Sequence, residues 1–61
     1  MEDVKLKDLE QRAAAYVREN PGVDALDVSE YLEIGLPESV SICNKLLEYG
    51  VIIPAEGDKY K

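Results

Sequence analysis

The chain has 61 residues, with 13 Asp and Glu against seven Lys and Arg, which allows one small acidic domain with a modest core. One cysteine and no histidine leave no Cys–His or Ser–His pair and no metal-binding set, so we expect no enzyme, no cofactor and no metal. The sequence also has no apolar run long enough to span a membrane and no signal-peptide pattern. The lone cysteine fits a reducing, cytoplasmic setting.

The first predicted element is a helix over about residues 4–19. Its apolar side chains recur at helical spacing, at Leu6, Leu9, Ala13, Tyr16 and Val17. The alanine run at residues 13–15 favours a helix and has little bulk, so another helix of the same chain can approach it closely. Residues 20–22, Asn-Pro-Gly, end this helix, and Val23 is expected to add a short extended segment.

A second helix is predicted over about residues 25–33. Asp24 can cap its first turn through the side-chain carboxylate, and Asp27 gives a partial match to a capping box. Gly35 and Pro37 follow and end the helix, because glycine permits a positive φ and proline suits the start of a new helix.

A third helix is predicted over about residues 37–49, closing at Gly50 in a left-handed conformation. Its expected core stripe is Val40, Cys43 and Leu47, with Cys43 as a buried small hydrophobe. Together with three residues of the earlier helices, these form the predicted core: Leu9, Val17, Leu32, Val40, Cys43 and Leu47.

The last segment, residues 51–61, predicts a β-hairpin. A β-branched run leads to Pro54, which belongs at a strand edge, and Gly57 lies in the turn before a short return strand. A lone hairpin is marginally stable in water, so Ile52 and Tyr60 are expected to pack it on the helices.

This order of elements resembles the winged helix-turn-helix superfamily over nearly the whole chain. PGVDALDVSEYL resembles the family's second helix, ESVSICNKLLEYGVI its recognition helix and IIPAEGDKYK a short wing. The resemblance implies one domain over residues 1–61, mainly α with a small β-hairpin, in a three-helix winged fold. The sequence departs at Glu33, where the family often has glycine, so the turn is expected to be about one residue longer.

A second, local resemblance is to ubiquitin-associated domains. There a hydrophobic-Gly-hydrophobic triplet, here Ile34-Gly35-Leu36, joins two helices of a three-helix bundle. That fold requires a helix after Gly50, and the breakers Pro54 and Gly57 argue against one.

The winged-helix resemblance implies DNA binding in transcriptional regulation, through the third helix and the wing. Carried onto this sequence, the contacts are Ser39, Ser41, Asn44 and Lys45 on the helix and Lys59 and Lys61 on the wing. Residues 21–58, however, contain eight acidic residues and one basic residue. Any DNA binding is therefore expected to be weak, or to depend on a protein partner or a homodimer.

The alternative is a protein-interaction module on the same fold, since some winged helices dock on proteins and have lost the basic surface. Ile42 and Tyr49, at the margin of the apolar arc of the third helix, are then the candidate contacts. A positive stripe from the third helix to the wing would favour DNA. An apolar patch ringed by acidic residues would favour a protein partner.

Overall fold

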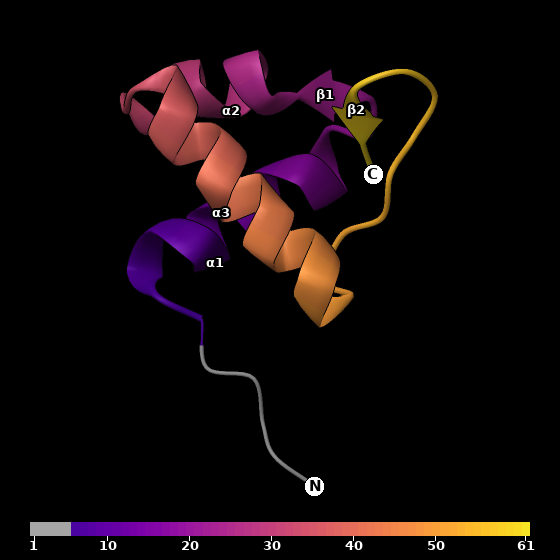
Figure 1. The fold of residues 1–61 in the computed structure, drawn as a ribbon, viewed down its shortest axis with the longest axis horizontal. Helices are drawn as coiled ribbons and strands as arrows, with labels where there is room; N and C mark the ends of the chain where they lie inside the picture. The colour runs from indigo at the N-terminus through magenta and orange to yellow at the C-terminus, as the bar shows by residue number, and fades with distance from the viewer. Residues whose placement is uncertain (1–5) are drawn as a thin grey trace, which may run out of the picture.

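The computed structural model describes residues 6–61 as three helices and a two-stranded antiparallel sheet (Figure 1). In chain order the elements are α1 (Asp8–Glu19), β1 (Val23–Asp24), α2 (Ala25–Leu32), α3 (Leu36–Tyr49) and β2 (Lys59–Tyr60). This confirms the predicted fold class, a mainly α structure with a small hairpin in a three-helix winged arrangement. Residues 4 and 5, where the first helix was predicted to begin, lie outside the described residues.

Helix α1 begins later than predicted, because Lys7 is extended and acts as the N-cap. The side chain of Glu10 folds back and accepts a hydrogen bond from the Lys7 backbone N–H at 2.9 Å. Such a contact satisfies a donor that the first helical turn leaves without an intrahelical partner. The start of the helix is thus fixed by Glu10, a buried carboxylate that the apolar pattern does not include.

The hairpin pairs with β1, which is the short extended segment predicted at Val23. Val23 lies opposite Tyr60 and Asp24 opposite Lys59, while Ile53 and Lys61 exchange two backbone hydrogen bonds of 2.9 Å. The C-terminal segment is therefore a wing held on the stretch between α1 and α2 (Figure 1). Residues 51–61 contain no helix, which rules out the ubiquitin-associated alternative.

The core lies where the three helices meet the start of the wing. Its buried apolar residues are Ala13, Ala14, Val17, Val28, Ile42, Cys43, Leu46 and Ile52. The buried alanines confirm that α1 allows close approach, and Ile52 packs the wing as predicted. Beside the core, the rings of Tyr16 and Tyr31 stack with their centroids 4.2 Å apart and join α1 to α2.

The predicted core stripe of α3 is wrong in part, because the helix is rotated relative to the prediction. Val17 and Cys43 are buried as expected, and Leu9, Leu32 and Leu47 are partly buried against the core. Val40, however, is exposed, and its place in the core is taken by Ser39. The Ser39 hydroxyl donates a 2.7 Å hydrogen bond to the backbone carbonyl of Ala25, so a polar side chain is satisfied inside the core.

The turn between α2 and α3 places its positive φ at Glu33 rather than at Gly35. Glu33 ends α2 in the left-handed region with φ 58°, whereas Gly35 has φ −69° and serves as the N-cap of α3. The Ile34 N–H returns to the Ser29 carbonyl at 3.0 Å, which closes the end of α2. A glutamate in this conformation is strained, because its Cβ crowds the following carbonyl.

Candidate functional site

Helix α3 carries most of the residues predicted to contact DNA or a protein partner. Its outer face, which points away from α1 and α2, is open to solvent (Figure 1). Ser41, Asn44 and Lys45 are exposed there, as the DNA-binding prediction requires. Glu38 and Glu48 are exposed on the same helix and carry the opposite charge. The outer face is thus polar, with more negative than positive side chains.

Two predicted site residues are not available on the surface. Ser39 is fully buried and bonded to Ala25, so it cannot face a DNA base or phosphate. Ile42 is only 8% exposed and belongs to the core, so it cannot anchor a protein partner. Both corrections follow from the rotation of α3. Tyr49, the other predicted interaction residue, is 45% exposed.

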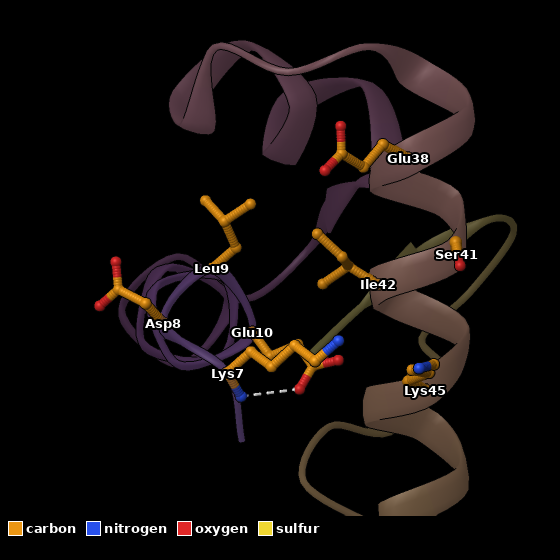
Figure 2. A pocket seen from close by; sticks show the side chains of 8 residues that line it. All are labelled: Lys7, Asp8, Leu9, Glu10, Glu38, Ser41, Ile42 and Lys45. Carbon is orange, nitrogen blue, oxygen red and sulfur yellow. Dashed lines mark hydrogen bonds between the residues drawn. The ribbon is translucent and has the colours of Figure 1, made fainter.

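On the α1 side of α3 lies a cavity of about 380 Å³, which we call the α1-side cavity (Figure 2). Its lining mixes two lysines, three carboxylates and three other side chains: Lys7, Lys45, Asp8, Glu10, Glu38, Leu9, Ser41 and Ile42. Figure 2 shows Glu10 turned back to the Lys7 backbone, so one carboxylate is already engaged in capping α1. Because both signs of charge line this cavity, it presents no field of a single sign.

On the opposite side, α3 borders a groove formed with β1, the start of α2 and the wing, which we call the α3–wing groove. It measures about 350 Å³ and is lined by Asp24, Ala25, Leu26, Leu36, Val40, Asp58 and Tyr60. Leu26 is 51% exposed, Leu36 46% and Val40 38%, so three of the six large exposed apolar side chains among residues 6–61 converge here. Scattered surface apolar residues are normal, but a cluster of them beside carboxylates is informative.

The charge beside this groove is negative and fixed by α2. The Asp24 carboxylate accepts the Asp27 backbone N–H at 2.9 Å, and this hydrogen bond lowers the pKa of Asp24 below its usual value. Asp24 therefore stays ionised at neutral pH. Lys59 approaches Asp24 across the β1–β2 pair and offsets part of its charge, while Asp58 adds a second carboxylate to the lining.

Tyr60 in the lining of the groove and its neighbour Cys43 on α3 are uncharged. Burial raises the pKa of the Cys43 thiol, and burial together with the neighbouring thiol raises the pKa of Tyr60. Both side chains are consequently neutral at physiological pH. Cys43 is thus a structural contact between α3 and the wing, in accordance with its predicted role as a buried small hydrophobe.

Within residues 6–61 the exposed lysines do not form a stripe from α3 to the wing. Lys45 lines the α1-side cavity, whereas Lys59 lies in β2 opposite Asp24, on the other side of α3. Lys61 is exposed at the end of the wing. On α1, Arg12 is paired with Asp8 at 3.2 Å. The predicted DNA contacts on helix and wing are therefore split by the structure into two groups.

The described part of the chain contains no cluster of three or more carboxylate or cysteine side chains placed to hold a metal ion. Among residues 6–61 there is also no helix with the length and apolar character needed to cross a bilayer. Comparison with models of protein families, with curated proteins and with solved structures finds no match to this chain.

Proposed function

We propose that this chain is a non-catalytic, cytoplasmic protein-interaction module on a winged helix-turn-helix scaffold. The observation that carries the proposal is the α3–wing groove, in which three half-exposed apolar side chains lie beside Asp24 and Asp58. An apolar patch edged with carboxylates suits a protein surface and repels phosphates.

The size of the groove indicates a weak or assisted interaction. Covering the remaining exposed area of Leu26, Leu36 and Val40 would contribute roughly 2–4 kcal/mol, since full burial of such a side chain contributes about 1.5–3 kcal/mol. Association itself costs at least about 4 kcal/mol in lost freedom of motion. A partner must therefore add contacts outside the groove, such as charge pairs with the acidic surface.

DNA binding in transcriptional regulation is the second candidate. It is supported by the exposure of Ser41, Asn44 and Lys45 on α3, since asparagine pairs well with adenine and lysine with guanine or phosphate. Against it stands the net charge of −6, which leaves few cations to displace counterions from DNA. If DNA binds, the affinity is expected to be low, with a shallow dependence on salt.

A pulldown from native lysate, with and without nuclease, separates the two candidates. The baits are the wild type, Val40→Lys in the groove, and Tyr49→Lys, which adds the same charge to another exposed apolar site on α3. We expect a nuclease-resistant partner that binds the wild type and Tyr49→Lys but not Val40→Lys. Capture that is equal for all three baits would contradict the assignment to the groove.

A direct DNA titration is the complementary measurement. Fluorescent duplex DNA is titrated at low salt with the wild type and with Lys45→Glu/Lys59→Glu, which reverses one cation of α3 and one of the wing. We expect little binding by either protein. Binding by the wild type that the double variant loses would favour the DNA candidate, and nuclease-sensitive capture in the pulldown would agree with it.

A further inference from the structure

We infer that the α3–wing groove binds a cationic amphipathic helix of a partner protein, through two apolar side chains about one turn apart and flanking Lys or Arg. This inference rests on the proposed function and names the chemical class of the partner. Three features of the groove carry it: the spacing of its apolar side chains, its openness to solvent, and the sign of the surrounding charge.

The spacing of the groove residues matches a helix. Leu36 and Val40 are four residues apart on α3, so they lie about one helical turn apart on the same side of it, and Leu26 of α2 lines the groove with them. A partner helix with apolar side chains at positions i and i+4 presents the same spacing. This is the arrangement in which an amphipathic helix lies on an apolar groove.

The groove is open to solvent, since it measures about 350 Å³ and its three apolar side chains, Leu26, Leu36 and Val40, remain 38–51% exposed. A helix lying across the groove would therefore cover these side chains with side chains of its own. The polar side chains of that helix would then lie over the rim.

The rim selects cationic side chains. Asp24 and Asp58 line the groove, and residues 21–58 contain eight acidic residues against Lys45 as the single basic one. Lys45 lines the cavity on the other side of α3 and does not offset this charge. Lys59 offsets part of the charge of Asp24, so Asp24 and Asp58 together keep the lining negative. Lys and Arg beside the apolar pair of a partner would therefore be attracted. A second copy of this chain carries a net charge of −6 and would be repelled.

The test uses a displayed library of random linear peptides, each long enough for about four helical turns, selected on the whole folded protein. We expect enriched peptides with apolar residues three or four apart and with Lys or Arg around them. Synthetic versions should bind Val40→Lys on the order of tenfold more weakly than the wild type. They should bind Tyr49→Lys, the matched control on α3, as tightly as the wild type.

Charge reversal tests the sign of the partner. Asp58→Lys should weaken the selected peptides, whereas Glu48→Lys changes the net charge equally on the outer face of α3, away from the groove lining, and should weaken them less. Replacing the peptide lysines with glutamate should restore affinity for Asp58→Lys. Circular dichroism of each variant confirms that the fold is retained.

The possible negative results separate the cationic-helix inference from the proposed function. The cationic-helix inference would be overturned if the enriched peptides were acidic or uncharged, or if they bound Val40→Lys as tightly as the wild type. Either result would leave a protein-interaction role for the chain. Concentration-dependent dimers in light scattering, lost in Val40→Lys, would replace the inferred partner with a second copy. No enriched peptide, together with DNA binding that depends on Lys45 and Lys59, would overturn both the inference and the proposed function.

Discussion

The two sides of α3 border spaces of similar size but of opposite character. The α1-side cavity holds two lysines and three carboxylates, so its charges largely compensate one another. The α3–wing groove has three half-exposed apolar side chains and two carboxylates. The difference shows that volume alone does not identify a binding site. The mixed charges of the larger cavity favour neither a cationic nor an anionic ligand, whereas the smaller groove favours a ligand that is both apolar and cationic.

The difference between the two sides arises from the rotation of α3. Ser39, Ile42, Cys43 and Leu46 are the residues that face the core. Val40 is consequently turned out of the core and into the groove, whereas Lys45 lines the opposite cavity. Substitutions on the two sides of α3 therefore test which of its residues face the core.

The largest effect is expected at Leu46, which is fully buried. Leu46→Ala should cost about 2–5 kcal/mol of unfolding free energy, because it leaves a cavity in the core. Val40→Ala, on the exposed groove side, should change stability by less than about 1 kcal/mol. Chemical denaturation of both variants measures the difference. Equal losses, or a larger loss for Val40→Ala, would mean that α3 faces the core through the residues first predicted.

The next largest effect is expected at the hydrogen bond between Ser39 of α3 and Ala25 of α2. Ser39→Ala removes the donor to the partly buried Ala25 carbonyl and should cost about 1 kcal/mol, the usual net contribution of one hydrogen bond. Ser41→Ala is the matched control on the exposed face of α3 and should stay within about 0.5 kcal/mol. Thermal or denaturant melts compare the two. If Ser39→Ala leaves the unfolding free energy unchanged, this hydrogen bond does not stabilise the packing of α3 on α2.

Much of the fold was predictable because local signals agreed. Asp24, the Asn-Pro-Gly turn, Gly50 and the hairpin turn with Gly57 each mark an element boundary by their own backbone chemistry. The packing of the hairpin through Ile52 was also predicted, because a lone hairpin needs a surface to pack on, whereas the pairing of Val23 with Tyr60 was not.

The surface was less predictable, because the apolar residues of α3 cover an arc wider than its core face. Val40 and Leu47 fit the helical period as well as Ile42 and Leu46 do, and Ser39 gives no sequence signal that it is buried. Its burial depends on a carbonyl contributed by α2, fourteen residues away. Leu26 and Leu36 were the available hint of a groove, since both are apolar residues outside the predicted core faces.

A smaller, stabilising effect is expected at the turn that sets α3 against α2. Glu33→Gly should raise the unfolding free energy by about 0.5–1 kcal/mol, because glycine adopts φ 58° without the crowding of a Cβ. The matched control is Glu30→Gly inside α2, where glycine should destabilise by about 1 kcal/mol. Opposite signs in denaturant melts are expected. Destabilisation in both would mean that Glu33 makes contacts that outweigh its strain.

The smallest effect concerns the acidic rim of the groove. Because the hydrogen bond from Asp27 lowers the pKa of Asp24 in the folded state, the unfolded chain binds the proton more readily. The resulting stabilisation is present above the ordinary pKa of 3.8 and is lost as the pH falls through the lowered folded value. Asp24→Asn keeps a capping oxygen but does not titrate, so its melting temperature should fall less steeply between neutral and acid pH. Melting curves of both proteins over that range give the comparison, and parallel slopes would mean that the Asp24 carboxylate is not held at the start of α2. The same variant removes one charge from the groove, so it should also bind the cationic peptides more weakly at neutral pH, which links the helix cap to the proposed site.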